Sequence, residues 1–396
     1  MTNIRAYEKK KESNANSDYN KVIIQHKLRI FYRALLSMLL AAAVLTALYI
    51  SNLNKIYTEY QVITSTKRTK IENAVSENLN GNILTYSNDG ANCTDIKGNV
   101  LWNQTFEMQN PMVEINGKVA AIADYNGRII YVVDDTGSMG QIDTGMPIRT
   151  ICVSQNGVVA AVLDDSDVNA IYLYNSKGDT IAYFKTTMKK SGYPISVAIS
   201  ENSEIVIVSY LYLDRGIVTS NVAFYNFGPV GQNEVDNYVS GYSYSDALVP
   251  EVGFLSNTTS FALADNRLVI YKGKQIPTSH AEVLLNDEVQ SVYYNEDYIA
   301  LVYLNASGTT KYKMDIYNDS GKVILSKEFD IDYTDIFFHG GCVIVYNESE
   351  CLISNMKGKE KFNGKFKSTV ETLIPTSKIS EFITITTDKI ATIELK

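Results

Sequence analysis

The sequence predicts an all-β fold, an eight-bladed β-propeller preceded by one transmembrane α-helix. Three observations lead to this prediction: a turn motif that recurs at intervals of 37 to 50 residues, eight apolar strand segments with matching spacing, and one uncharged apolar run near the N-terminus. A chain of 396 residues is too long for one small core, unless that core is a closed array of repeats.

The recurring turn has the form Asn/Asp-x-x-Gly, and residues 318–321 and 175–178 are its clearest copies. The first residue can hydrogen-bond its own backbone, and the glycine can adopt the left-handed conformation that closes a bulged hairpin. The glycines of seven copies, some of them degenerate, are Gly98, Gly137, Gly178, Gly228, Gly273, Gly321 and Gly358, with spacings of 39, 41, 50, 45, 48 and 37 residues. This range is typical of propeller blades.

Between these turns lie segments that we interpret as the second strand of each blade. They are nearly continuous runs of β-branched and other apolar residues, which is typical of strands buried on both faces. The eight segments are 83–86, 119–123, 158–163, 205–209, 261–264, 298–304, 342–346 and 382–386. They predict eight blades, and a seven-bladed ring with an extra hairpin is the alternative.

The last repeat supplies only three strands, at 369–375, 381–386 and 390–395, and the sequence stops before another turn motif. Residues 59–66 form an alternating strand pattern with no hairpin partner nearby. We therefore expect residues 59–66 to be the missing outer strand of the last blade. Such pairing closes the ring and removes two exposed sheet edges.

The N-terminal region is predicted to attach the chain to a lipid bilayer through residues 31–50, from Phe31 to Ile50. Its core, residues 34–50, is uncharged and about as long as the shortest bilayer-spanning helices. A cleaved signal peptide is the alternative, but its apolar region is shorter and ends in a small-x-small site, whereas this run ends in Leu48-Tyr49-Ile50.

Four regions follow from this prediction. Residues 1–30 form a basic, largely disordered cytoplasmic tail, 31–52 a transmembrane helix, 53–58 a stalk, and 59–396 the propeller. Three basic residues, Lys27, Arg29 and Arg33, flank the front of the span, and only Lys55 lies within ten residues behind it. The positive-inside rule then predicts a single-pass protein of the cell membrane, with its propeller extracytoplasmic.

The charge distribution excludes one class of partner. Residues 1–50 contain eight basic and three acidic residues, a net charge of +5, whereas the remainder carries −13. An acidic main domain argues against nucleic acid, whose recognition needs a basic surface. The four cysteines are expected to be buried free thiols, because Cys342 and Cys351 would lie about four rows apart in one hairpin.

Two resemblances follow from short motifs. Residues 98–104, a turn followed by a strand that contains Trp102, resemble the blades of quinoprotein-type and WD40-like propellers. Residues 59–63 (EYQVI) and 107–111 (EMQNP), with the apolar N-terminal span, resemble an uncharacterised family of membrane-anchored β-propeller-like proteins of Gram-positive bacteria. The resemblance implies an anchor and a propeller over the whole chain, and it supplies no known active residues.

The sequence favours no cofactor, metal or catalytic constellation. Quinone-dependent propeller dehydrogenases use adjacent cysteines and a tryptophan, but this chain has one tryptophan and no adjacent cysteines. Its three histidines, His26, His280 and His339, lack metal-ligand spacing. We therefore predict that the protein is not an enzyme.

Candidate binding residues lie in the longest insertions, which we place at 187–193, 211–219 and 229–247, and in a nearby acidic loop. Loops that follow second and fourth strands emerge on one face of a propeller, so these side chains can converge there. Tyrosine and arginine are typical of interfaces, and tyrosine with carboxylates also suits sugars. The candidates are Asp165, Asp167, Tyr193, Arg215, Tyr242, Tyr244 and Asp246. Alternatively, the tyrosines only pack long loops against the rim.

These observations predict a membrane-tethered binding or scaffold module for an envelope protein or glycan. The first alternative is a polysaccharide-cleaving hydrolase or lyase that uses Asp, Glu and Tyr side chains on the loop face. The second is a transmembrane sensor with the N-terminal tail as its output.

Overall fold

The computed structural model describes residues 26–46, 55–69, 71, 73–165, 168–186, 192–214, 216–306 and 308–396. The chain divides into two compact units, Met1–Ile56 and Tyr57–Lys396. In the first unit, residues His26–Thr46 form a helix of 21 residues, which is long and apolar enough to cross a membrane. The predicted tail up to residue 25 and the end of the predicted span, residues 47–52, lie outside the described residues.

The second unit is an all-β domain of eight antiparallel four-stranded sheets. Blade 1 contains β2 (Val75–Leu79), β3 (Asn82–Ser87), β4 (Gly90–Thr94) and β5 (Val100–Thr105); blade 2 contains β6 (Pro111–Asn116), β7 (Val119–Asp124), β8 (Ile129–Asp134) and β9 (Gly137–Asp143); blade 3 contains β10 (Ile148–Val153), β11 (Val159–Asp165), β12 (Val168–Tyr174) and β13 (Thr180–Thr186); blade 4 contains β14 (Tyr193–Ile199), β15 (Ile205–Asp214), β16 (Ile217–Asn226) and β17 (Tyr238–Ser245).

The second half of the domain repeats this order. Blade 5 contains β18 (Glu251–Ser256), β19 (Thr259–Leu263), β20 (Arg267–Lys272) and β21 (Thr278–Leu284); blade 6 contains β22 (Val289–Tyr294), β23 (Tyr298–Leu304), β24 (Tyr312–Asn318) and β25 (Val323–Phe329); blade 7 contains β26 (Asp335–His339), β27 (Cys342–Tyr346), β28 (Glu350–Asn355) and β29 (Glu360–Lys365); blade 8 contains β30 (Thr372–Pro375), β31 (Glu381–Ile385), β32 (Lys389–Leu395) and β1 (Tyr60–Lys67).

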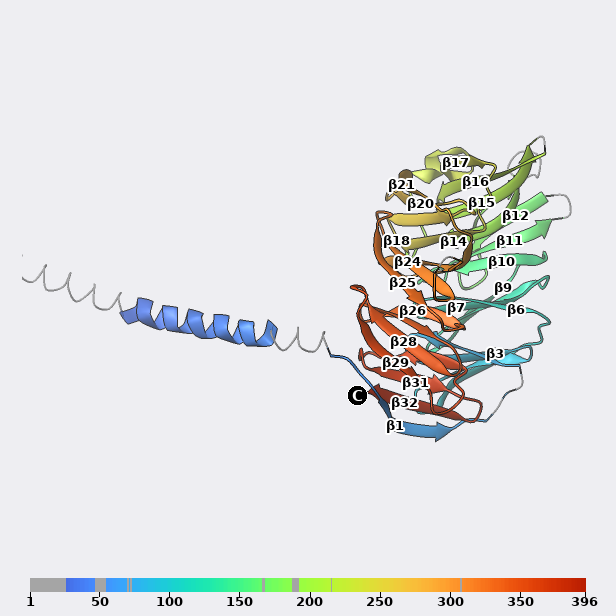
Figure 1. Cartoon of the computed structure of the whole chain (residues 1–396). Coiled ribbons are helices and arrows are strands. Elements are labelled where there is room, and N and C mark those ends of the chain that lie inside the picture. Colours follow the sequence, from blue (N-terminus) through green and yellow to red (C-terminus); the bar gives the residue numbers. More distant parts are fainter. Residues whose placement is uncertain are drawn as a thin grey trace, which may run out of the picture. The chain divides into compact units, whose positions relative to one another are not determined.

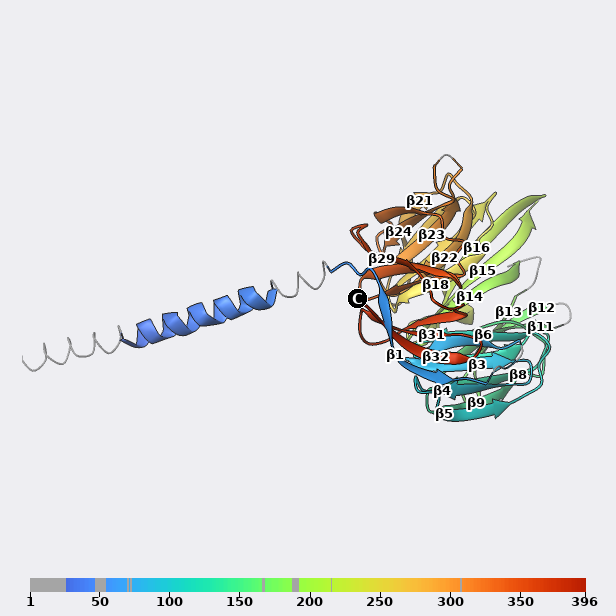
Figure 2. The same cartoon turned by 60° about the horizontal axis from the view of Figure 1, so that its bottom comes forward.

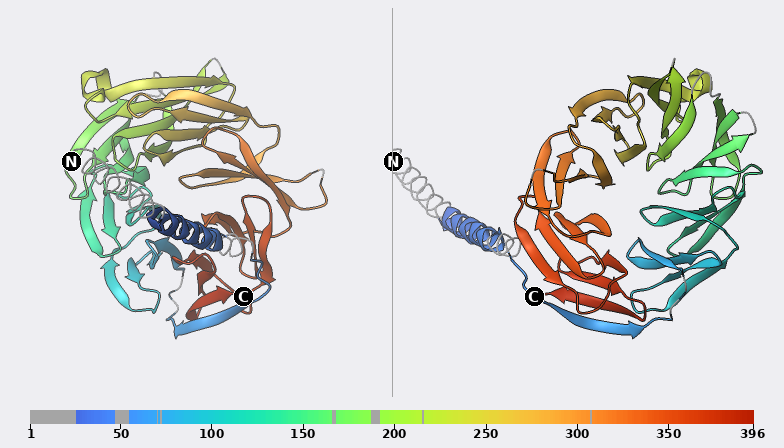
Figure 3. Two further views of the ribbon diagram at one scale, coloured as in Figure 1. Left: turned by 90° about the vertical axis from the view of Figure 1, so that its left-hand side faces the viewer. Right: turned by 45° about the vertical axis from the view of Figure 1, so that its right-hand side comes forward.

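The sheets succeed one another around a ring, and the first strand of each blade is the innermost one (Figure 3). First strands of neighbouring blades contact each other, as β10 does with β14 and β14 with β18. The prediction of an eight-bladed β-propeller is therefore confirmed, and the seven-bladed alternative is wrong.

The eighth blade is assembled from two distant parts of the chain. Its strand order is β1-β32-β31-β30, so a segment from the start of the domain supplies the outer strand (Figures 1 and 2). Pairing runs from Tyr60 opposite Leu395 to Lys67 opposite Lys389. The Tyr60 ring is buried, and its hydroxyl accepts a hydrogen bond of 2.6 Å from the backbone N–H of Lys367 in the connection from blade 7. The strand expected at residues 59–66 thus lies at the place that the repeat count gives it.

The second strands form the centre of each sheet and fill the space between blades. Residues Val119 to Ala123 of β7 are fully buried, and so are the apolar residues of β11. Alternate side chains of such a strand point to opposite faces of the sheet and pack against the blade on that side. Each hydrophobic cluster therefore joins two adjacent blades. Continuous apolar sequence is therefore required in these strands.

Four of the seven predicted turns share one geometry. At residues 175–178, Asn175 Oδ1 accepts hydrogen bonds of 3.0 Å from the N–H groups of Lys177 and Asp179. Gly178 donates its N–H to the Asn175 carbonyl and has φ of +93°, which a residue with a Cβ rarely adopts. The same bonds form in the turns that begin at Asp95, Asn318 and Asn355.

All seven turns connect a third strand to a fourth strand, and a register shift accompanies each of these strand pairs. Blade 4 departs most from the pattern. Its turn at 226–228 leads into an insertion with two short 3₁₀ helices, η1 (Gly231–Asn233) and η2 (Val235–Asn237), before β17 begins.

Two predicted insertions are wrong as loops. Residues 211–219 are mostly strand, because β15 extends to Asp214 and β16 begins at Ile217 with continuous pairing. The second half of 229–247 is β17, whose backbone pairs with β16 along its length. Glycine and serine in this segment reduce its local strand propensity, but the hydrogen bonds to β16 compensate. Residues 187–191 lie outside the described part of the chain.

The four cysteines are buried free thiols, as expected. Cys351 lies opposite Tyr346, so Cys342 is four rows away in the same hairpin. Burial raises the pKa of the Cys93 thiol to about 11, which leaves it protonated and unreactive at neutral pH.

The loops and turns of the propeller lie on two opposite faces. The top face carries the loops that follow second and fourth strands, and the bottom face carries the turns that follow first and third strands. Because β1 is a fourth strand, the chain enters the propeller on the bottom face, where the backbone N–H of Thr58 bonds to the carbonyl of Lys396 at 2.9 Å.

Candidate functional site

The structure distributes the sequence-predicted residues over the top face and one outer strand. Asp165 ends β11, Tyr193 begins β14, and Asp246 follows β17, so these three lie at the top face. Tyr242 and Tyr244 lie within β17. Asp167 and Arg215 lie outside the described residues.

The two tyrosines of β17 pack between blades 4 and 5. The hydroxyls of Tyr244 and Tyr271 lie 2.5 Å apart, and burial raises the pKa of Tyr244. The Tyr242 hydroxyl accepts from the backbone N–H of Ser279 at 3.1 Å and lies 3.2 Å from the Pro277 carbonyl. These contacts agree with the alternative in which tyrosines secure the rim.

The other described candidates have separate partners. Asp165 accepts a hydrogen bond of 2.9 Å from Lys185, and Asp246 adopts φ of +57° with its N–H on the Val218 carbonyl. Within the described part of the chain, no hydrogen bond or ion pair joins two of the predicted residues. The five described candidates are therefore not linked to one another directly.

A different set of side chains lies around the axis of the ring. Four carboxylates project from first strands: Glu77 on β2, Glu114 on β6, Glu251 on β18 and Asp335 on β26. Because the first strands are innermost, these residues form the wall of the central channel. We call them the channel carboxylates.

All four channel carboxylates have a raised pKa. Burial raises the pKa of Glu114 to about 7, and repulsion from Glu251 and Glu77 adds to it. Burial alone raises the pKa of Glu251 to about 7. The pKa of Glu77 is also raised by burial, although Tyr86 donates a hydrogen bond to it at 2.9 Å, and that of Asp335 is raised by burial and by Glu77. The Glu114 side chain is nevertheless exposed to solvent, and the other three are half-buried. The surrounding wall of the channel therefore desolvates these carboxylates without enclosing them.

A cavity of about 480 Å³ occupies the channel toward the bottom face. Its wall contains four glutamates from four different blades: Glu114, Glu201, Glu251 and Glu296. Aromatic rings of Phe254 and Tyr294 and the backbone of several first strands complete it. The described residues that line this cavity include no lysine, arginine or histidine. The cavity therefore attracts positive charge.

The glutamates are spread around the wall rather than gathered at one point. Among the described residues, no group of three or more His, Cys, Asp or Glu side chains is close enough to hold a metal ion. Four carboxylates on four blades match a ligand that carries several separated positive charges.

Sequence reasoning missed the channel carboxylates. Each is a single acidic residue within a first strand, and in isolation it reads as an ordinary solvated position of an alternating strand. One signal could have identified them: when the repeats are aligned on their turn motif, an acidic residue occupies the first strand in four of the eight blades.

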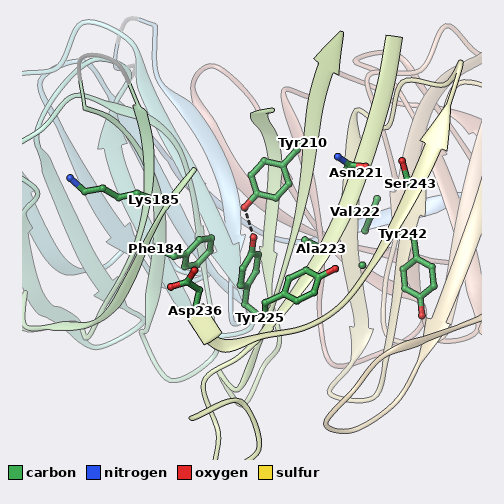
Figure 4. A pocket seen from close by; sticks show the side chains of 12 residues that line it. Phe184, Lys185, Tyr210, Asn221, Val222, Ala223, Tyr225, Asp236, Tyr242 and Ser243 are labelled. Atoms are coloured by element: carbon green, nitrogen blue, oxygen red, sulfur yellow. Dashed lines mark hydrogen bonds between the residues drawn. The ribbon is translucent and has the colours of Figure 1, made fainter. Parts of the chain in front are cut away.

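A second cavity, of about 440 Å³, lies on the rim between blades 3 and 4. Its walls come from β13, from β15 to β17 and from the insertion of blade 4. Figure 4 shows Phe184 and Asp236 at one end and Tyr242 and Ser243 at the other, with Lys185 pointing away. We call this cavity the rim pocket.

The fold and the channel define a closed eight-bladed β-propeller with an acidic axis. The chain belongs to a family of unknown function, DUF5711, whose model matches residues 53–395. No curated protein matches the chain.

Solved structures show the same fold. BamB from Moraxella catarrhalis is 12% identical with a TM-score of 0.50, and the match covers 85% of this chain and 100% of BamB. Sqt1 from Saccharomyces cerevisiae is 12% identical with a TM-score of 0.52, over 86% of this chain and 99% of Sqt1. A eukaryotic initiation factor is 12% identical with a TM-score of 0.52, over 83% of each chain. At such identities the likeness concerns the fold alone.

Proposed function

We propose that this protein is a membrane-tethered binding propeller without catalysis, displayed outside the cytoplasm, whose acidic channel receives a cationic segment of an envelope protein. The observation that carries the proposal is the cavity of about 480 Å³ lined by four glutamates without a basic side chain. Glutamates on four blades suit a segment with several lysine or arginine side chains, because each can meet a separate carboxylate.

The raised pKa values favour a role of these carboxylates in binding over a role in stabilising the fold. An isolated carboxylate in a restricted channel costs free energy when it ionises, and a bound cation offsets that cost. The cation favours the ionised form, so binding releases protons and strengthens as the pH rises through about 7.

Attachment to a membrane rests on the helix His26–Thr46 and on the charges near it. Lys27, Arg29 and Arg33 lie in the N-terminal part of this helix, and Lys55 is the nearest described basic residue after it. This asymmetry favours a cytoplasmic N-terminus. Reporters fused after Lys396 test it: we expect alkaline phosphatase to be active there and a cytoplasm-dependent fluorescent protein to be dark, and the reverse pattern would refute this orientation.

Binding is tested with fluorescein-labelled decalysine and the full-length protein in detergent. We expect the double variant Glu114→Gln, Glu251→Gln to weaken binding by about tenfold or more. The matched control, Glu234→Gln with Glu348→Gln, removes two exposed glutamates outside the channel, and we expect wild-type affinity. Equal losses in both double variants would mean that decalysine reads only the net charge and would overturn the channel as the site.

The second candidate function is a polysaccharide-cleaving enzyme, and one observation favours it. A carboxyl group with a pKa of about 7 suits a general acid, and Glu114 and Glu251 both have this value. Glycosidases, however, divide the roles by separating the two pKa values. Release of reducing ends from purified cell-wall polysaccharide, lost in Glu114→Gln, would favour the enzyme over the binding module.

A further inference from the structure

The rim pocket is built from an insertion that, among the described residues, blade 4 alone contains between its third and fourth strands. In the turns that begin at Asp95, Asn175, Asn318 and Asn355, third and fourth strands are joined directly, but blade 4 inserts η1 and η2 between β16 and β17. Asp236 and Asn237 of this insertion both have positive φ, +56° and +59°. Aspartate and asparagine tolerate this left-handed conformation better than other non-glycine residues, so they allow the tight turn that leads into β17.

The floor of the pocket is made of small residues. Ala223 on β16 lies opposite Gly241 on β17, so the pleated surface there is low. A side chain at position 241 would collide with the hydroxyl of Tyr238, which means that the Tyr238 ring extends over this glycine. The ring is 47% exposed, although it contacts Tyr225 edge-on with centroids 6.0 Å apart. The pocket therefore presents an accessible aromatic ring supported from below.

The inner wall is apolar and rigid. Phe184 of blade 3 stacks on Tyr225 of blade 4 with ring centroids 4.0 Å apart, and both rings are buried. The hydroxyls of Tyr210 and Tyr225 satisfy each other at 2.8 Å. No ligand is needed to satisfy these groups, so the wall is formed before anything binds.

Three polar side chains around this wall have a different status. Asn221, Asp236 and Ser243 line the pocket, and in the described part of the chain none of their side-chain atoms makes a hydrogen bond to protein. An amide, a carboxylate and a hydroxyl together offer both donors and acceptors. Their partners must be water or a ligand with alternating donors and acceptors.

We propose that the rim pocket binds a pyranose unit of a glycan. A sugar ring has an apolar face of C–H groups, which matches the exposed Tyr238 ring, and an edge of hydroxyls, which matches Asn221, Asp236 and Ser243. The volume of about 440 Å³ lies within the range of small-ligand sites. This site is independent of the channel, so the propeller has two separate binding surfaces.

The experiment uses the full-length protein in detergent with two soluble probes, chitohexaose and cellohexaose. Saturation-transfer NMR detects which sugar protons contact the protein, and titration calorimetry gives the affinity. We expect at least one probe to bind, with its ring protons saturated most strongly, and Tyr238→Ala to weaken binding by about tenfold. Tyr238→Phe keeps the ring and should retain most of the affinity.

The matched control is Tyr183→Ala, which removes another exposed tyrosine, from β13 outside the pocket, and should leave sugar binding unchanged. The double variant Glu114→Gln, Glu251→Gln should also bind sugar normally, so failure of the channel proposal is distinguishable. Melting temperatures of all variants exclude unfolding as the cause of a loss.

An extended peptide that lies along the edge of β17 is the rival occupant. A hexapeptide of alternating serine and phenylalanine, titrated under the same conditions, represents it. If neither sugar binds at millimolar concentration, if Tyr238→Ala and Tyr183→Ala behave alike, or if only the peptide binds, the glycan proposal is overturned.

Discussion

The carboxylates of the channel and those of the outer turns have the same chemistry and opposite pKa shifts. At Asp319, a hydrogen bond from Lys272 lowers the pKa, and at Glu360 one from Lys327 does the same. At Asp95, partial burial opposes the shift, but hydrogen bonds from Asn99 and Lys97 lower the pKa. Glu114 and Glu251 in the channel have raised values instead.

The difference distinguishes carboxylates that stabilise the fold at neutral pH from those in the proposed binding channel. The ionised form of the outer carboxylates has a lower free energy in the folded protein than in the unfolded chain, so these groups stabilise the fold at neutral pH. The ionised form of the channel carboxylates has a higher free energy in the folded protein, so at neutral pH they destabilise the fold. Functional sites often cost stability, so this contrast supports the proposed role of the channel in binding. The following predictions break or sharpen this contrast.

Removal of β1 is expected to have the largest effect. Deleting residues 57–67 eliminates seven pairs with β32 and the buried Tyr60 ring. We expect the free energy of unfolding to fall by about 4 kcal/mol or more, since several ladder hydrogen bonds contribute about 1 kcal/mol each. The open ring would also separate the channel carboxylates, and ¹³C-detected titration would record pKa values closer to ordinary ones.

A control for this deletion keeps the strand and removes only outward apolar groups. Val62→Ser with Ile63→Ser changes two side chains that are about half exposed, and we expect a melting temperature near that of the wild type. An unchanged melting curve after the deletion itself would show that the ring closes without β1.

The next largest effect concerns an outer turn. Asp95→Ala removes the acceptor for the N–H groups of Lys97 and Asn99 and for the Asn99 amide. We expect a loss of about 1–2 kcal/mol in denaturant unfolding at neutral pH. Asp95→Asn keeps the Oδ1 acceptor, as asparagine does at Asn175 and Asn318, and should cost much less. Equal losses in the two variants would contradict the hydrogen-bond explanation.

Substitution in the channel is expected to have the opposite sign. The raised pKa means that the folded protein holds these protons more tightly than the unfolded chain does. The contribution of Glu114 and Glu251 to the free energy of unfolding is therefore fully present below their ordinary pKa. It is lost as the pH rises through about 7.

Neutralising both groups with Glu114→Gln and Glu251→Gln should stabilise the protein at pH 8 by about 0.5–1 kcal/mol, a modest value because water in the channel screens the charges. At pH 4.5, where the wild-type groups are already protonated, we expect little difference. Urea unfolding at the two pH values measures both quantities. A variant that is less stable than the wild type at pH 8 would refute the proposed cost.

The smallest effect is expected at an outer ion pair. Glu360→Gln removes the 2.6 Å ion pair with Lys327. Exposed ion pairs of this kind contribute about 0.2–1 kcal/mol to stability. Because the pKa of Glu360 is lowered, this stabilisation is present above its ordinary value and is lost as the pH falls through the folded value. The wild-type advantage should also shrink in 0.5 M salt. A loss that salt leaves unchanged would argue for packing instead of charge.

Sequence alone predicts the parts of this fold that are governed by local chemistry. The turn at residues 318–321 carries its own signal, because the amide of Asn318 and the left-handed Gly321 act within five residues. The apolar sequence of β23 likewise predicts that this strand is buried. Such features, repeated along the chain, give the number of blades and the position of β1.

The channel could not be predicted in this way because its properties are made by residues far apart. Burial in the channel is the main cause of the raised pKa of Glu114, and the wall of the channel comes from several blades. Repulsion from Glu251 adds to the shift, and Glu251 stands 137 positions away in the sequence. The prediction that Tyr242 and Tyr244 lie in a loop is wrong for a related reason. Pairing with β16 gives strand structure to a segment that contains glycine and several serines. Tertiary partners decide both cases.

The two-part eighth blade also sets the order of events during biosynthesis. Tyr60 and its partner Leu395 are 335 positions apart, so β1 leaves the ribosome long before β32 exists. At about 5–20 residues per second, β1 waits roughly 15–70 s for its partner. Throughout that interval β1 lacks the strand that pairs with it in the folded domain. A strand rich in threonine, serine and lysine at its end, as in YQVITSTK, is suited to that delay because it aggregates less readily than the apolar strands it will join.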